Sequence, residues 1–179
     1  MSLFKKVIKA GRRRPLFVPD ACETAQTVTL GRPQLERMLP HRDPFLLLDG
    51  IDAVDLEGGA VRGFRHVNPD DPVFRGHFPG DPVYPGVYQI EAIGQLGICL
   101  QHLLANKSAE IGPDDKPRRL RLLKVHHALF QGEVRPGQDI QIIATSIEDG
   151  DYVATCAGQV VVGDEVKALA VYEVFMLDD

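Results

Sequence analysis

The chain has 179 residues, of which 44% are hydrophobic and 25% are charged, and its formal net charge is −5. This length suits one domain that can bury a core, and the composition is ordinary for a globular protein. No apolar run is long enough to span a bilayer and no signal-peptide core follows the N-terminal charges, so we expect no stable membrane insertion. Three cysteines without metal-type spacing argue against a disulfide framework and predict a reducing, cytoplasmic location.

The first fourteen residues are strongly basic. They contain no acid and six cations, which are Lys5, Lys6, Lys9, Arg12, Arg13 and Arg14. Such a run is either a solvated tail or a patch that attracts an acidic partner or a membrane surface. We therefore expect a basic N-terminal extension over residues 1–25 and a single domain over residues 26–179.

Short elements precede the centre of the chain. A helical turn is expected from Gln34 to Met38. Residues 45–54, which are rich in leucine and isoleucine, predict a strand, and residues 60–67 predict its partner across the Gly58–Gly59 turn.

The central stretch joins a stiff loop to an apolar helix. Residues 76–86 contain three prolines and three glycines, which predict a rigid, turning loop. Residues 86–104 contain no proline and are apolar almost all round, so they predict a buried helix with Pro85 in its first turn. Such a helix should not carry a carboxylate, yet it carries Glu91, with Gln95 one turn later on the same face.

This stretch supplies three groups suited to acid–base chemistry. His77 in the stiff loop is a candidate base, and Glu91 is a candidate acid. The backbone N–H of Gly86, at the positive end of the helix dipole, is a candidate donor to developing negative charge. The alternative is a surface histidine and a helical glutamate that faces water.

A loop and a meander of strands follow the helix. Residues 105–116 predict the loop, and residues 118–128 predict a strand with Leu120 and Leu122 on one face. Three more strands with hairpin turns at 148–151 and 163–164 are expected over residues 140–147, 152–162 and 166–175. The adjacent histidines 126 and 127 point to opposite faces of a strand, so we expect no metal site. An antiparallel sheet around a single apolar helix is an α+β fold.

Several motifs resemble one enzyme family, the (3R)-hydroxyacyl-[acyl carrier protein] dehydratases, which are hot-dog-fold enzymes of fatty-acid synthesis. The resemblance is closest over Gly76–Val87 followed by Glu91, Ala92 and Gln95, and the spacing of His77 and Glu91 is the family's. Similar segments at 39–49 and 130–137 lie in the family's order. The resemblance runs from about residue 32 to the C-terminus.

The resemblance implies an α+β hot-dog fold, in which an antiparallel sheet wraps around one long central helix. It also implies a homodimer or higher homo-oligomer with active sites at the subunit interface, where His77 meets the partner's Glu91. His77 would remove the proton beside the thioester carbonyl, and Glu91 would protonate the departing hydroxyl. The implied substrate-binding residues are Gly86, Val83, Val87 and Gln95: the Val83 carbonyl would orient the His77 ring, and Gln95 would hold Glu91.

The implied reaction dehydrates (3R)-3-hydroxyacyl thioesters, carried on the phosphopantetheine arm of acyl carrier protein, to trans-2-enoyl thioesters. No cofactor, metal or nucleic-acid partner is expected. A carboxylic acid donates a proton only while it holds one, and burial among apolar side chains favours that form. A one-base scheme, in which His77 shuttles the proton and Glu91 only places water, is also open.

Some features differ from the family pattern. Glu91 matches the dehydratase-only branch, whereas Asn68-Pro69-Asp70 and Asp81 look more like the branch that also isomerises the double bond. The alternatives are therefore a bifunctional dehydratase/isomerase, a dehydratase of a dedicated polyketide-like or pigment lipid pathway, and a non-catalytic acyl-thioester binding module.

Two further groups of residues have open roles. His41 and Arg42 are expected to hold the central loop from beneath, which is a structural role. A basic cluster is either the charged outer face of a strand or a contact for an acidic carrier protein. It consists of Lys116, Arg118, Arg119, Arg121 and Lys124.

Overall fold

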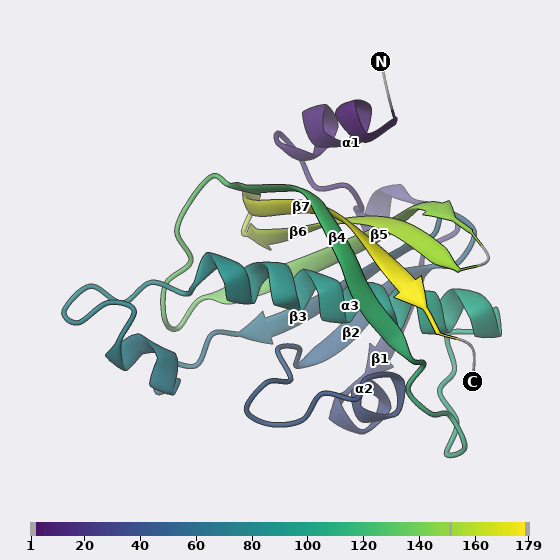
Figure 1. Ribbon diagram of the computed structural model, residues 1–179, viewed down its shortest axis with the longest axis horizontal. Helices are drawn as coiled ribbons and strands as arrows, with labels where there is room; N and C mark the ends of the chain where they lie inside the picture. Colours follow the sequence, from purple (N-terminus) through teal and green to yellow (C-terminus); the bar gives the residue numbers. More distant parts are fainter. Residues whose placement is uncertain (1–2, 151, 178–179) are drawn as a thin grey trace.

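The computed structural model describes residues 3–150 and 152–177, and its architecture is one antiparallel sheet packed against one long helix (Figure 1). The seven strands lie in the order β1-β2-β3-β5-β6-β7-β4. The strands are β1 (Gln26–Leu30), β2 (Gly50–Asp55), β3 (Ala60–His66), β4 (Leu120–Phe130), β5 (Asp139–Asp149), β6 (Val153–Val162) and β7 (Glu165–Met176). The helices are α1 (Leu3–Gly11), α2 (Arg32–Met38) and α3 (Gly86–Asn106), with 3-10 turns η1 (Pro19–Ala21) and η2 (Pro72–Arg75). This is the expected α+β hot-dog arrangement.

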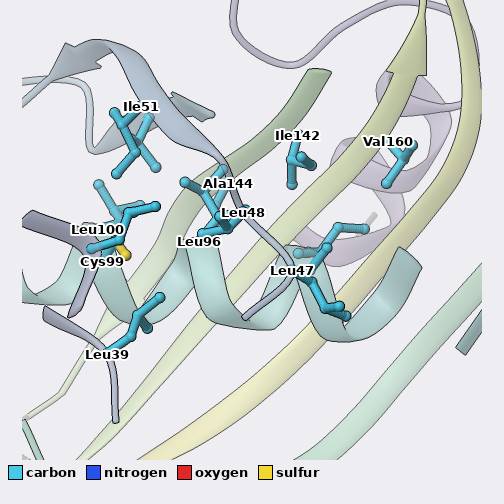
Figure 2. Close-up of a cluster of buried hydrophobic side chains, with 14 of the residues drawn as sticks. Leu39, Leu47, Leu48, Ile51, Leu96, Cys99, Leu100, Ile142, Ala144 and Val160 are labelled. Carbon is cyan, nitrogen blue, oxygen red and sulfur yellow. The ribbon is translucent and has the colours of Figure 1, made fainter. Parts of the chain in front are cut away.

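Helix α3 runs along the concave side of the sheet and forms the centre of the core (Figure 1). In Figure 2 its apolar side chains meet residues of β2, β5 and β6 and of the segment between α2 and β2. The labelled residues are Leu39, Leu47, Leu48, Ile51, Leu96, Cys99, Leu100, Ile142, Ala144 and Val160. Burying this apolar surface is the main stabilisation available to the fold, because each fully buried leucine or isoleucine contributes about 1.5–3 kcal/mol.

Small residues allow α3 to approach the sheet closely. A Cβ atom added to Gly97 would lie 1.9 Å from the hydroxyl of Tyr172, and one added to Gly158 would lie 2.3 Å from Ile93. The Tyr172 hydroxyl donates a hydrogen bond of 3.2 Å to the carbonyl of Ile93. Glycine at these two contacts therefore sets the depth at which the helix lies on the sheet.

The predicted helix over 86–104 is confirmed as α3, with one correction at its start. Pro85 is the residue before the first turn rather than a member of it, since its ψ of 135° is extended. The helix ends at Asn106, and the next residue, Lys107, has a left-handed φ of 50°.

The strand predicted over 45–54 is wrong in its first half, because β2 begins only at Gly50. The backbone of Phe45 and Leu47 bonds instead to the side chain of Gln95 on α3. Sequence reasoning also did not identify β1 or α1. The 148–151 turn includes residue 151, which lies outside the described residues.

The N-terminal segment lies against the sheet. Phe17 is buried in a second, smaller apolar cluster with Ile143, Val161 and others. Gln159 of β6, fully buried, donates to the carbonyls of Gly11 and Arg14 at 2.6 and 3.1 Å and accepts from the N–H of Leu16 at 2.7 Å. These bonds satisfy the backbone where α1 ends.

Candidate functional site

His77 is held by its own loop. Its Nδ1 lies 2.8 Å from the carbonyl oxygen of Val83, and the Val83 N–H donates to the His77 carbonyl at 2.9 Å. This is the contact that the family resemblance implied. Because a carbonyl only accepts, Nδ1 carries the hydrogen, and in the neutral ring Nε2 is free to accept a proton.

The N-terminus of α3 lies beside His77. Both border a cavity of about 560 Å³, which is also lined by Val87 and Phe130. A Cβ atom on Gly86 would lie 2.7 Å from the Phe130 ring, so only glycine fits against it. Gly86 is the first residue of α3, where backbone N–H groups have no intrahelical acceptor and the helix dipole is positive. Val87 is 68% exposed at the opening of this cavity.

Glu91 lies further along α3, next to Gln95. The Gln95 side chain, 1% exposed, donates to Glu91 Oε1 at 3.0 Å and to the Phe45 carbonyl at 2.8 Å. Its own oxygen accepts the Leu47 N–H at 2.9 Å. The amide therefore holds one oxygen of Glu91 while anchoring the segment that precedes β2.

His41 is a residue of this site that sequence reasoning placed elsewhere. Its Nε2 lies 3.5 Å from Glu91 Oε1, the same oxygen that Gln95 contacts. Burial lowers the pKa of His41, opposed by the attraction of Glu91 and assisted by the Arg42 charge. The Arg42 guanidinium bonds to the carbonyls of Leu39, His41 and Glu36. The expectation that this pair holds the central loop is therefore wrong, because Arg42 caps its own segment and His41 meets Glu91.

Glu91 is less buried than the apolar helix predicted. Its side chain is 33% exposed and borders a cavity of about 270 Å³. Tyr172 and Val174 of β7 line this cavity together with Ile90, Gly94 and Ile98 of α3. Leu120 and Leu122 lie across from them, and Arg118 and Arg121 of the basic cluster also border it.

A single chain does not bring its two principal candidates together. His77 and Gly86 border one cavity, whereas Glu91, Gln95 and His41 border another. Among the residues that the structure describes, no group of three or more histidine, cysteine or acidic side chains is arranged to hold a metal ion. None of the described helices has the length and apolarity needed to cross a membrane.

Residues 39–172 match the family model described as a FabA-like domain. The chain is 30% identical over 146 residues to 3-hydroxyacyl-[acyl-carrier-protein] dehydratase FabZ of Aliarcobacter butzleri, covering 81% of this chain and 96% of the relative. It is 32% identical over 159 residues to the FabZ of Caulobacter vibrioides, covering 89% and 96%.

Solved structures agree on the fold. The dehydratase heterocomplex ApeI:P from Xenorhabdus doucetiae superimposes with a TM-score of 0.61 at 19% identity, covering 81% of this chain and 91% of that one. An HP0420 homologue from Helicobacter felis gives 0.56 at 11% identity, covering 82% and 100%. At these identities the likeness shows the fold alone.

Proposed function

Because the chain belongs to the FabA-like domain family, we propose that it dehydrates (3R)-3-hydroxyacyl thioesters on acyl carrier protein to trans-2-enoyl thioesters in fatty-acid biosynthesis. The curated relatives named above carry the name of this activity and match nearly their whole length. The enzyme is a hydro-lyase that works as a homodimer or higher homo-oligomer in the cytoplasm.

The geometry supports a definite role for each residue. Nε2 of His77 takes the proton from C2 of the acyl chain, and that electron pair forms the C2–C3 double bond as the C3–O bond breaks. The Glu91 carboxyl gives its proton to the departing hydroxyl, which leaves as water. The Gly86 N–H stabilises the enolate-like oxygen, an effect of about 3 kcal/mol for one such donor.

The observation that carries the proposal is that one chain holds two separated halves of this chemistry. His77 and Gly86, the proposed base and oxyanion donor, border one cavity. Glu91, the proposed acid, borders the other with Gln95 and His41. The first cavity lies at the N-terminus of α3 beside Phe130 of β4, and the second lies between α3 and strands β4 and β7. We propose that His77 works with the partner's Glu91 across a two-fold interface.

Glu91 also presents a preferred oxygen to the substrate. Gln95 and His41 both approach Oε1, at 3.0 and 3.5 Å. The Gln95 N–H donor stabilises negative charge on Oε1, which leaves Oε2 to carry the transferable proton. Gln95 and His41 are positioning residues in this scheme.

The test is turnover of a 3-hydroxyacyl thioester by the parent chain, His77→Ala and Glu91→Gln. Both variants should keep the parent's circular dichroism and lose most activity, because neither an alanine nor an amide can move the required proton. Near-parental rates in either variant would contradict its assigned role. Chromatography of the parent's product should show the trans-2-enoyl thioester alone.

A further inference from the structure

A basic surface outside the family-matched residues lies next to the His77 half of the site. Helix α1 and the turn that follows it together present six exposed cations. Both precede residue 39, where the match to the family model begins. The cations are Lys5, Lys6, Lys9, Arg12, Arg13 and Arg14. None of them takes part in an ion pair among the described residues. Their charge is therefore available to a partner.

The surface is structurally joined to the proposed active site. Four cations line a hollow together with Ile8 and Gln131; they are Lys5, Lys9, Arg12 and Arg13. The Arg12 guanidinium donates to the Gln131 amide oxygen at 3.4 Å. The Gln131 amide nitrogen donates in turn to the Arg12 carbonyl at 2.9 Å. Its chain neighbours Phe130 and Gly132 both line the His77 cavity. The cationic hollow and the cavity thus meet across one short stretch of chain.

The way α1 is mounted exposes charge rather than apolar surface. Phe4 packs on the His126 ring of β4 with 5.2 Å between centroids, and Gly11 is buried where α1 meets β7 and Gln159. Val7 and Ile8 are half-buried. A helix that lies in a membrane needs a free apolar face, whereas α1 packs Phe4 against β4 and contacts β7 of its own sheet. The arrangement favours an acidic protein over a lipid surface.

We propose that the outer face of α1 is a docking surface for the acidic acyl carrier protein, which delivers its thioester into the adjacent His77 cavity. The inference rests on the proposed function, since it takes the carrier-bound acyl chain as the substrate. Opposite charges steer encounter and set register, while the flexible phosphopantetheine arm spans from the docked protein to the chemistry.

The experiment uses Lys5→Glu/Lys9→Glu, whose two positions are one turn apart and face the hollow. The comparison variant is Lys116→Glu/Arg119→Glu, which reverses two exposed cations of the other basic cluster, the alternative contact for the carrier protein. A loss of carrier binding in this variant alone would overturn the α1 docking surface. Lys5→Gln/Lys9→Gln removes the charge without adding acids and serves as the milder variant. Affinity for purified acyl carrier protein is measured without turnover, at low and high salt, and KM and kcat are then measured on carrier-bound and on pantetheine-bound 3-hydroxyacyl thioesters.

The α1 reversal should weaken carrier binding roughly tenfold at low salt and less at high salt, with a smaller loss in the glutamine variant. It should raise KM for the carrier-bound substrate and leave kcat unchanged. Both KM and kcat for the pantetheine-bound thioester should stay at the parent's values. Unchanged carrier affinity in the α1 reversal, or a loss confined to binding of anionic phospholipid vesicles, would overturn the docking surface. A chain that binds carrier protein through α1 but dehydrates neither thioester would overturn the proposed function alone.

Discussion

Nε2 of His41 lies 3.5 Å from Oε1 of Glu91, and the His41 ring is partly buried. This pairing places a partly buried imidazole beside the proposed acid. It extends the site to a residue that precedes the catalytic loop by more than thirty positions.

His41→Gln tests this relationship through pH. Burial lowers the pKa of His41 below its usual 6.5, so the folded chain binds fewer protons than the unfolded chain just below that pH. Its contribution to stability therefore falls as pH drops through 6.5, and His41→Gln should remove that part of the slope. The measurement is urea unfolding of both proteins between pH 7.5 and 5.5. Parallel pH profiles would contradict a buried, neutral His41.

Gln95→Leu should reduce both stability and turnover. The change leaves the Phe45 carbonyl and the Leu47 N–H without their partner and frees Glu91. Two buried groups left unpaired cost about 2–4 kcal/mol. Gln101→Leu is a matched control, since Gln101 is also buried on α3 but bonds to Asp149 and Cys156. The control should lose stability and retain kcat; equal kcat in both variants would contradict the positioning role of Gln95.

The same glutamine shows where sequence reasoning stopped. Proline and glycine spacing with an unbroken apolar run was enough to predict α3 and the stiff loop before it, and the turn signals predicted most later strands. Residues 45–49 have strand composition, but the backbone of Phe45 and Leu47 bonds to the side chain of Gln95, nearly fifty positions away. Local pattern holds no information on such a contact, nor on the closeness of His41 to Glu91. The exposure of the Glu91 side chain depends on which residues pack over that face of α3, and the hydrophobic pattern of the sequence does not identify those residues.

Tyr84→Phe should leave the fold as stable as the parent or slightly more so. Tyr84 is buried, which raises the pKa of its phenol to about 12, and its hydroxyl has no hydrogen-bond partner among the described residues. Removing an unpaired buried hydroxyl relieves a desolvation penalty of about 1 kcal/mol while keeping the ring against Phe74 and Tyr88. Thermal unfolding measures the change. A clear fall in Tm would mean that the hydroxyl has a partner.

Gln159→Leu should release the N-terminal segment from the sheet. The substitution removes the acceptor of the Leu16 N–H and the donor to the Gly11 and Arg14 carbonyls. Trypsin cleavage after Arg12 and Arg13 should then become faster than in the parent. Unchanged cleavage, with intact circular dichroism, would show that α1 is held mainly by other contacts.

The central claim is that the working site is shared between two chains, and co-refolding His77→Ala with Glu91→Ala tests it most directly. Random pairing makes about half of all dimers mixed, and each mixed dimer regains one intact pair, so about a quarter of all sites should work. Each variant refolded alone should show little activity. The rate of the mixture, with mixed dimers confirmed by mass, should therefore recover to about a quarter of the parent's. No recovery above the separate variants would contradict the shared site.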